Sequence, residues 1–307
     1  MSFHREHSDE VLCSAVHPTR SLMATGQQGK TPFILVWDYR NTLKPPVPPN
    51  SSGMSPAATL GERSPTKESL VALIGAHRRG VTHLCFSPCG RYLASTSCDD
   101  WHSLVVHDWE ATTVLLNRPT SKDKVFDLAF VPPPPPQHSA EEMERIPSPP
   151  LELVQCGVNL LRFWTLSDGG HNATWQSATL GAEGQWQTFL CVGFIGVDPW
   201  GATGSNASTG TAAHPQKPRL NGMRTVVGCQ DGSLYMFAGA QLSKEVPVHT
   251  GPVNVLSCQG DVLATGGHDG LIKVGYVLHV ISMIGYRIYL QCIAGRIRLD
   301  FIPTKVS

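Results

Sequence analysis

One cluster of residues in this sequence has the side chains needed for metal chemistry. Cys98, His102 and His107, together with Asp99 and Asp100, offer the thiol, imidazole and carboxylate groups that bind zinc. Structural zinc sites are built from two pairs of ligands at short spacing, and this group lacks that paired arrangement. His107 also lies in a strand-like segment with a structural place in a repeat. We therefore expect no metal ion and no other cofactor.

Catalytic motifs are equally weak. The segment from Gly26 to Thr31 has a faint likeness to a phosphate-binding loop, but its glycines are too close together. It also connects two strand-like segments instead of opening a helix. The sequence contains no Gly-x-Ser-x-Gly motif of the hydrolase type. We expect no catalytic residues, and a protein that is not an enzyme.

Composition narrows the class of partner. The 307 residues include 24 Lys and Arg and 24 Asp and Glu, so the formal net charge is zero. A neutral chain lacks the long-range field that attracts nucleic acid or an anionic membrane, and we expect neither as a partner. The nine cysteines are odd in number and form no Cys-x-x-Cys motif, which fits a reducing compartment. The polar N-terminus and the lack of a long apolar run indicate a cytoplasmic protein.

Internal repeats determine the expected fold. His7 precedes a strand-like segment, and Trp37-Asp38 closes the same repeat 30 residues later. His77 and His107 are also 30 residues apart, so His107 occupies the position of the tryptophan and Asp108 that of the aspartate. This equal spacing is the strongest single observation in the sequence.

Three further repeats follow with weaker landmarks. The third begins near Asp123 and closes on Trp164, and the fourth closes on the strand that follows Asp231 and Gly232. The fifth begins at His249 and continues through Asp269-Gly270. Short strands rich in Val, Ile, Leu and aromatic residues, bounded by Gly, Asp and Pro, are typical of antiparallel blades.

The repeats are similar to WD-type blades, and the sequence predicts an all-β, WD-repeat β-propeller with about five recognisable blades. In such blades the histidine before the first strand bonds the aspartate of a turn, which implies a structural pair of His249 and Asp269. Glycine after aspartate suits a hairpin turn that requires a positive φ. We interpret the landmark residues as structural blade residues: His7, Trp37, Asp38, His77, Asp108, Trp164, Asp231, His249 and Asp269.

The blades are expected to span residues 1–274, with solvated inserts near 42–68, 132–150 and 199–222. These inserts are rich in Pro, Gly, Ser and Thr and too poor in apolar residues to pack. Residues 275–307 form a divergent tail without the blade pattern, because Gly275-Tyr276 stands where Trp-Asp is expected. We expect this tail to pack poorly and the propeller to be incomplete or open. The alternative is that residues 277–290 supply makeshift strands against the open edge.

The tail has two candidate origins. It is either an alternative C-terminus or translated intron sequence in a gene model, and the abrupt break inside a repeat favours the second.

With the repeats laid out, the sequence resembles the echinoderm microtubule-associated protein-like family. The likeness rests on the stretch from His17-Pro18 to Ala24-Thr25-Gly26-Gln27, on Cys156-Gly157-Val158 with Arg162-Phe163-Trp164, and on Ala264-Thr265-Gly266-Gly267. It covers about residues 3 to 274, interrupted by the inserts. Members of that family carry tandem atypical propellers and associate with microtubules.

The resemblance implies a microtubule-associated protein: a non-catalytic module that binds tubulin or cytoskeletal proteins in the cytoplasm. Many members grip the lattice through a basic region and a coiled coil, and this sequence contains neither. The alternative is therefore a WD-repeat scaffold, ciliary or centrosomal, that binds other proteins without contacting microtubules directly. A basic face would favour tubulin, which is acidic, whereas an apolar groove would favour the scaffold. The sequence leaves the binding face, the partner and the oligomeric state open.

Overall fold

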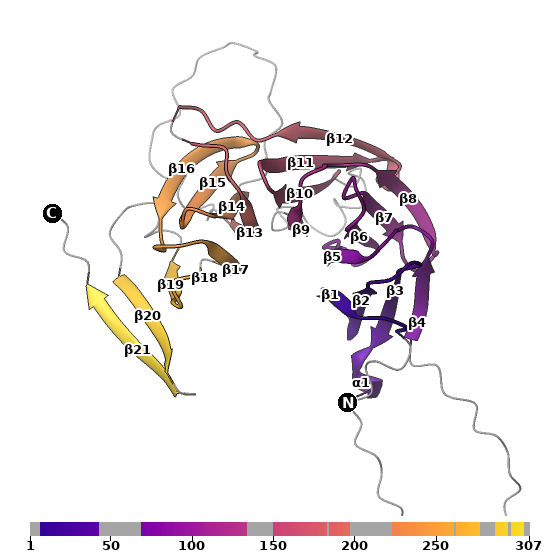
Figure 1. Ribbon diagram of the computed structural model, residues 1–307, viewed down its shortest axis with the longest axis horizontal. Coiled ribbons are helices and arrows are strands. Elements are labelled where there is room, and N and C mark those ends of the chain that lie inside the picture. Colours follow the sequence, from indigo (N-terminus) through magenta and orange to yellow (C-terminus); the bar gives the residue numbers. More distant parts are fainter. Residues whose placement is uncertain are drawn as a thin grey trace, which may run out of the picture. The chain divides into compact units, whose positions relative to one another are not determined.

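The part of the chain that the structure describes consists mainly of antiparallel β-strands (Figure 1). The structure, a computed structural model, describes residues 7–42, 69–133, 150–182, 184–196, 223–260, 262–276, 286–293 and 296–303. Five sheets follow one another along the sequence, four with four strands and one with five. This arrangement confirms the predicted all-β fold of about five blades. The chain divides into two compact units, residues 1–120 and 121–307, and we describe each by itself.

The N-terminal unit contains two blades whose strands pair in sequence order. Blade 1 consists of β1 (Val11–Val16), β2 (Leu22–Gln27), β3 (Phe33–Asp38) and β4 (Ser69–Ile74), with the short helix α1 (Tyr39–Thr42) after β3. Blade 2 consists of β5 (Val81–Phe86), β6 (Tyr92–Ser97), β7 (Leu104–Asp108) and β8 (Thr113–Arg118).

The C-terminal unit contains the remaining three blades. Blade 3 consists of β9 (Val125–Phe130), β10 (Leu151–Gly157), β11 (Leu160–Ser167) and β12 (Asn172–Ser177), with the 3-10 turn η1 (Asp168–Gly170) before β12. Blade 4 consists of β13 (Phe189–Gly196), β14 (Met223–Cys229), β15 (Ser233–Ala238) and β16 (Gln241–Pro247). Blade 5 consists of β17 (Val253–Gln259), β18 (Val262–Gly267), β19 (Ile272–Tyr276), β20 (Tyr286–Ile293) and β21 (Arg296–Pro303).

A β-bulge recurs where the first and second strands of each blade begin to pair. The register shifts directly after the first residue of the first strand in four blades, at Val11, Val81, Phe189 and Val253. In blade 3 the shift lies opposite Val125, between Cys156 and Gly157. A bulge re-aims the side chain beside it. It turns Val81 and Val253 toward the preceding blade, where each side chain is fully buried.

Glycines make room for these re-aimed side chains. A Cβ on Gly26 would lie 2.7 Å from Cβ of Val81, and one on Gly228 would lie 3.0 Å from Cβ of Val253. The first separation is shorter than real Cβ contacts and the second is tighter than most of them, so glycine makes room for Val81 in blade 1 and for Val253 in blade 4. The surrounding contact between blades 1 and 2 is a core that includes Ile34, Val36 and Phe86.

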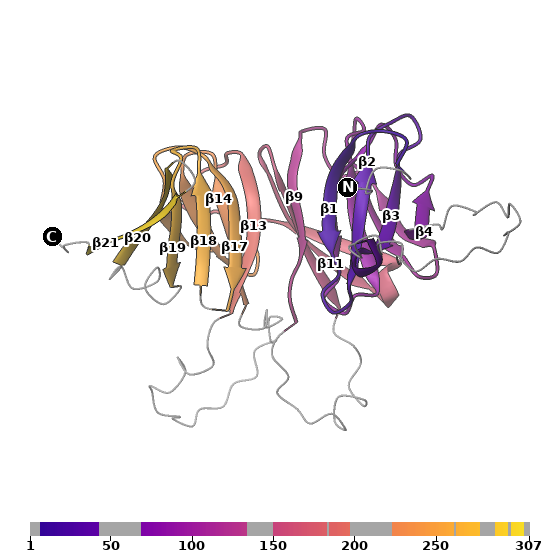
Figure 2. The same ribbon diagram turned by 90° about the horizontal axis from the view of Figure 1, so that it is seen from below.

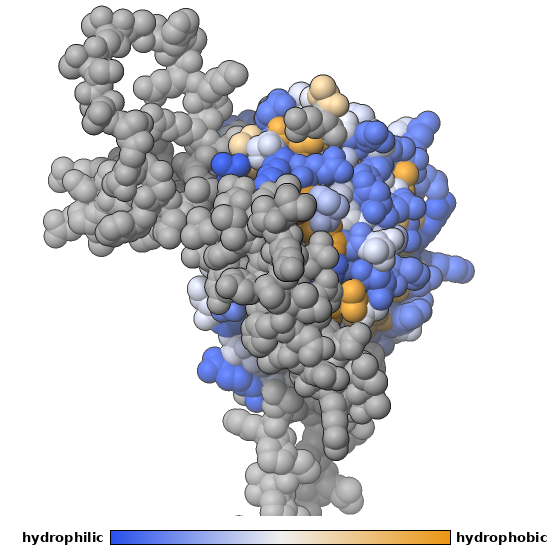
Figure 3. Space-filling model, turned by 90° about the vertical axis from the view of Figure 1, so that its left-hand side faces the viewer, coloured by the Kyte–Doolittle hydropathy of each residue, from blue (hydrophilic) through white to orange (hydrophobic). Residues whose placement is uncertain are grey.

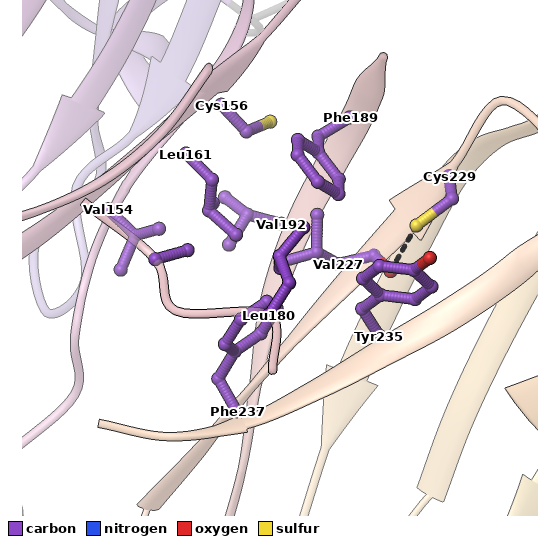
Figure 4. Close-up of a cluster of buried hydrophobic side chains, with 11 residues drawn as sticks. Val154, Cys156, Leu161, Leu180, Phe189, Val192, Val227, Cys229, Tyr235 and Phe237 are labelled. Carbon is purple, nitrogen blue, oxygen red and sulfur yellow. Dashed lines mark hydrogen bonds between the residues drawn. The ribbon is translucent and has the colours of Figure 1, made fainter. Parts of the chain in front are cut away.

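Blades 3 and 4 share the largest buried cluster in the C-terminal unit (Figure 4). Phe189 and Tyr235 lie with ring centroids 5.9 Å apart, and Tyr235 and Phe237 with centroids 6.5 Å apart. Cys156 and Cys229 fill the space beside the rings as small apolar side chains. Such a cluster buries faces that neither blade buries alone.

Two predicted regions need separate comment. The inserts near 42–68, 132–150 and 199–222 fall almost wholly outside the described residues, and their solvation stays a prediction. In the tail, the backbone of β20 pairs with β19, and β21 pairs with β20, so the sheet of blade 5 continues beyond the expected end of the repeats. This pairing differs from our expectation of a loose tail and is closer to the alternative in which the tail supplies strands.

Candidate functional site

The histidine before blade 5 joins two strands and a turn. His249 is buried, and its Nδ1 lies 2.9 Å from Oδ1 of Asp269 while its Nε2 lies 2.9 Å from Oγ1 of Thr265. The carboxylate of Asp269 also accepts backbone N–H bonds from Thr250 and Leu271. Burial acts to raise the pKa of Asp269, but these hydrogen bonds outweigh it and lower the pKa below its usual value. The structure thus brings together the pair inferred from the sequence and adds Thr265.

Removing this histidine should loosen blade 5. We expect His249→Ala to lower the free energy of unfolding by on the order of 1–3 kcal/mol, because Asp269 and Thr265 each lose a buried partner. Thermal unfolding measures the loss, and His268→Ala, an exposed histidine in the same turn, is the control. Weakened partner binding at unchanged stability would mean that His249 belongs to a binding surface instead.

Blade 1 has a similar set of hydrogen bonds around its histidine, with glutamine in place of the aspartate. His7 Nε2 lies 2.7 Å from Oγ1 of Thr25, which also accepts the indole N–H of Trp37 at 2.6 Å. Gln27 takes the place of the turn aspartate, with its Oε1 2.8 Å from His7 Nδ1. Asp38, at the end of β3, accepts the backbone N–H of Arg40 at 3.0 Å.

Blade 2 has histidines at the two corresponding positions, but they form fewer hydrogen bonds. Strand pairing puts His107 opposite Leu93 just as it puts Trp37 opposite Met23, so His107 occupies the tryptophan position that the spacing predicts. His77 Nε2 lies 2.7 Å from Oγ of Ser95. Within the described residues, Nδ1 of His77 and both ring nitrogens of His107 are buried without a hydrogen-bond partner.

Both imidazoles of blade 2 are therefore poor proton acceptors. Burial, and next the charge of His107, lowers the pKa of His77 to about 4, against a smaller opposing effect of Asp99. Burial lowers the pKa of His107 to about 4 as well. Nearby, the buried Asp108 accepts a hydrogen bond from Nε of Arg91 at 3.0 Å, and its Oδ1 accepts the backbone N–H of Ala111 in the turn after β7.

Blades 3 and 4 keep only part of the pattern. In blade 3 the indole N–H of Trp164 is bonded to Oε1 of Gln155 at 3.2 Å. In blade 4 Asp231 is exposed and accepts hydrogen bonds from Ser233 and from the side chain of Gln187. Phe237 stands opposite Thr225, the position that Trp37 has in blade 1. The sequence analysis missed the partners Gln27, Gln155 and Gln187, because glutamine departs from the aspartate and serine pattern of the other blades.

The side chains first considered for metal chemistry have structural roles. Oδ1 of Asp99 accepts the backbone N–H groups of Trp101 and Ser103, and Asp100 forms an ion pair with Arg79. Among the described residues, no three His, Cys, Asp or Glu side chains are placed to hold a metal ion. None of the helices described is long and apolar enough to cross a membrane.

Burial makes the thiols of Cys13 and Cys191 unreactive. Burial raises the pKa of Cys13 to about 12 and that of Cys191 to about 12. A thiol with such a pKa is almost entirely protonated at neutral pH and is a weak nucleophile.

The loop between β6 and β7 presents the most distinctive exposed side chain of the N-terminal unit. Trp101 is 51% exposed, although its backbone is fixed by Asp99 and by a 3.0 Å bond from Thr120 N–H to its carbonyl. The loop between β4 and β5 contacts this turn through the ion pair of Arg79 with Asp100. Arg78, the neighbour of Arg79 in that loop, is exposed. We call Arg78, Arg79, Asp100 and Trp101 the Trp101 surface. The sequence analysis considered this segment only for metal binding and missed its exposed tryptophan.

Elsewhere the surface is more ordinary. Where described residues are visible in Figure 3, hydrophilic side chains predominate and hydrophobic ones form small separate areas. Such scattered apolar residues are normal on a protein surface and indicate no binding site by themselves.

These features define a WD-repeat β-propeller protein. The family model for the WD domain, G-beta repeat, matches residues 68–102 and 240–274. The first range covers β4 of blade 1 with β5 and β6 of blade 2, and the second runs from β16 of blade 4 into β19 of blade 5. Among solved structures, the Cps50 (Swd1) β-propeller domain of Myceliophteria thermophila matches with a TM-score of 0.56 at 13% identity, over 88% of this chain and 66% of that one. The computationally designed Ika8 protein matches with a TM-score of 0.53 at 14% identity, over 96% of this chain and 75% of that one. The first of these, a β-propeller domain, supports the propeller fold.

Among curated proteins, the relatives carry the name expected from the sequence. Echinoderm microtubule-associated protein-like 2 of Rattus norvegicus is 25% identical over 278 residues, which cover 86% of this chain and 33% of that protein. Echinoderm microtubule-associated protein-like 4 of Xenopus tropicalis is 25% identical over 276 residues, 86% of this chain and 24% of the relative. Echinoderm microtubule-associated protein-like 1 of Rattus norvegicus is 28% identical over 176 residues, 54% of this chain and 17% of the relative. The resemblance to that family is confirmed, and the chain spans about a third or less of the length of these relatives.

Proposed function

We propose that this chain is a non-catalytic WD-repeat module that binds tubulin or another cytoskeletal protein in the cytoplasm. The relatives named microtubule-associated proteins support the class of partner. The histidines that precede the first strands of blades 1, 2 and 5 each form a hydrogen bond within their own blade: His7, His77 and His249. This structural use supports binding without catalysis.

The Trp101 surface is the observation that carries the proposal. Tryptophan and arginine are the residues most enriched among those that dominate protein–protein binding energy. Because Asp99 and Thr120 already fix the backbone of Trp101, ordering this turn on binding costs little entropy. The guanidinium of Arg78 is exposed and suits an acidic partner such as tubulin.

Co-sedimentation of the full chain with microtubules tests the proposal. We expect saturable pelleting that weakens as salt is raised, and Trp101→Ala should raise the apparent Kd about tenfold or more. Trp175→Ala is the control, because Trp175 has a similar exposed fraction but lies on β12 in the C-terminal unit. A chain that stays in the supernatant at all concentrations would exclude direct binding and favour the scaffold alternative. Equal effects of the two substitutions would remove the Trp101 surface from the proposal.

A further inference from the structure

Blades 4 and 5 have an aspartate at the same place in the turn between their second and third strands. Asp231 follows β14 and Asp269 follows β18, and each precedes a glycine with positive φ. In blade 5 the carboxylate of Asp269 is covered by His249, and only 9% of its side chain is exposed. In blade 4, by contrast, Asp231 is exposed. The same position is therefore shielded in one blade and open to solvent in the other.

The difference arises from the residue at the histidine position. His249 lies four residues before the start of β17, and Gln185 lies four residues before the start of β13. Thr265, the second partner of His249, corresponds by strand pairing to Val227, which has no polar side chain. Blade 4 thus has no imidazole over its turn aspartate, Asp231.

The carboxylate of Asp231 is charged at neutral pH. Burial acts to raise its pKa, but hydrogen bonds from Ser233 and Gln187 outweigh this effect and lower the pKa below its usual value. No cation among the described residues forms an ion pair with Asp231. Its negative charge is therefore left for a binding partner to neutralise.

An exposed tryptophan stands beside this carboxylate. Gln187, the residue after Trp186, donates from Nε2 to Oδ2 of Asp231 at 2.8 Å, and its Oε1 accepts the backbone N–H of Asp231 at 3.1 Å. Trp186 is 48% exposed, and its ring lies edge-on to the buried Phe189 with centroids 6.0 Å apart. We call Trp186, Gln187 and Asp231 the Trp186 surface.

This surface is held in place before any partner binds. The backbone N–H of Gln185 donates to the hydroxyl of Tyr235 at 3.0 Å, and Nε2 of Gln187 lies 3.3 Å from the same hydroxyl. The ring of Tyr235 belongs to the buried cluster of Figure 4. Figure 2 shows β13, β14, β17 and β18 side by side, which puts the loop before β13 and the turn after β14 at the same end of the two blades. Because this loop is already fixed, its ordering costs little entropy on binding.

The chemistry of the Trp186 surface selects a cation. A carboxylate and the electron-rich face of an indole both attract positive charge, and an arginine guanidinium can bond the first and stack on the second. The chain contains each half of such a contact elsewhere. Cζ of Arg162 lies 4.2 Å from the ring centroid of Trp175, and Nε of Arg91 donates to Asp108 at 3.0 Å.

We infer that the Trp186 surface binds an arginine side chain in an exposed segment of a partner protein. The guanidinium pairs with the carboxylate of Asp231 and stacks on the indole of Trp186. This contact belongs to the C-terminal unit and goes beyond the proposed function, because it takes a basic partner whereas the Trp101 surface suits an acidic one.

Fluorescence anisotropy of a fluorescein-labelled peptide of alternating Arg and Gly, titrated with the full chain, tests this inference. We expect saturable binding by the wild type. Trp186→Ala and Asp231→Asn should each raise the Kd about tenfold or more, because each removes one half of the contact. A peptide of the same length with Lys in place of Arg should bind more weakly, and one with Glu should not bind.

Three variants control for general effects of substitution. Trp175→Ala removes a tryptophan of similar exposure whose face already carries Arg162, and Asp123→Asn removes an exposed carboxylate in the loop before β9. Trp101→Ala changes the Trp101 surface in the N-terminal unit. All three should leave the Kd for the Arg peptide unchanged. Failure of microtubule binding would therefore leave this result unaffected.

Thermal unfolding of each variant is measured alongside, because Asp231 also bonds Ser233 and Gln187. If Asp231→Asn lowers the Tm, the exposed Trp186 decides: Trp186→Phe keeps an aromatic face and should retain more affinity than Trp186→Ala. An Arg peptide that the wild type does not bind, a Kd that Trp186→Ala leaves unchanged, or equal affinity for the Lys peptide would each overturn the inference.

Discussion

Gly232→Ala is expected to be among the most destabilising single-methyl additions in this chain. Gly232 has φ of +94°, in the region that L side chains rarely adopt, and a Cβ there would lie 2.2 Å from the carbonyl oxygen of His249. The obstacle is backbone, and it cannot swing away, because the amides of Val248 and His249 both bond the carbonyl of Gly232. We expect a loss on the order of 3–5 kcal/mol in the free energy of unfolding.

Gly270→Ala is the matched control for this substitution. Gly270 also follows an aspartate in a hairpin turn and has φ of +76°, but nothing lies within 4 Å of its added Cβ. Only the backbone strain remains, and it should cost about 1–2 kcal/mol. Urea unfolding followed by tryptophan fluorescence compares the two variants. Equal losses would mean that backbone strain alone decides the effect and that the contact with His249 carries no weight.

Acid should unfold the N-terminal unit through blade 2, and His107→Trp should reduce that sensitivity. The pKa of His77 and that of His107 are each lowered from 6.5 to about 4 in the folded state, so the unfolded chain binds more protons between those values. The contribution of these neutral histidines to the free energy of unfolding is therefore fully present above about pH 6.5 and decreases as the pH falls toward 4.

The variant isolates one of the two histidines. Each histidine should lower the free energy of unfolding by on the order of 2 kcal/mol when the pH falls from 7.5 to 5. Tryptophan at position 107 does not titrate, so the part of this loss that is due to His107 should disappear. The indole N–H also gains a partner if it reaches Oγ of Ser95, as that of Trp37 reaches Thr25 in blade 1. Urea unfolding at the two pH values measures the difference, with His171→Trp at an exposed histidine as the control. The same loss of stability on acidification in His107→Trp and wild type would refute this account.

Much of the blade architecture was predictable because it depends on local residue types. The equal spacing of His7 to Trp37 and of His77 to His107 placed His107 correctly in the tryptophan position. The bulges were not predictable, since they arise from pairing between strands and leave no mark in the composition of a single strand. The meaning of Gly26 and Gly228 was hidden for the same reason, because the valines that require them come from the next blade.

The candidate binding surface was harder to foresee than the blades. The loop around Trp101 contains Asp, Trp and His, and these residue types say nothing about which side chain faces solvent. Asp99 turns inward to bond backbone amides, and this leaves Trp101 outside. The tail showed the opposite difficulty. Its apolar segments lack turn residues that would set a register, yet the backbone of β20 finds three partners on β19, from Ile272 to Val274.

The recurring bulge has a consequence for how the number of repeats can change. Each such contact joins the first valine of one blade to a glycine of the preceding blade, Val81 to Gly26 and Val253 to Gly228. A duplicated copy of blade 5 placed after the original would bring its own Val253 to Gly266, which pairs with Val255 as Gly228 pairs with Cys191. Gain or loss of a whole repeat therefore keeps this fit wherever the preceding repeat has the glycine, whereas a cut inside a repeat separates the valine from the glycine of its own repeat.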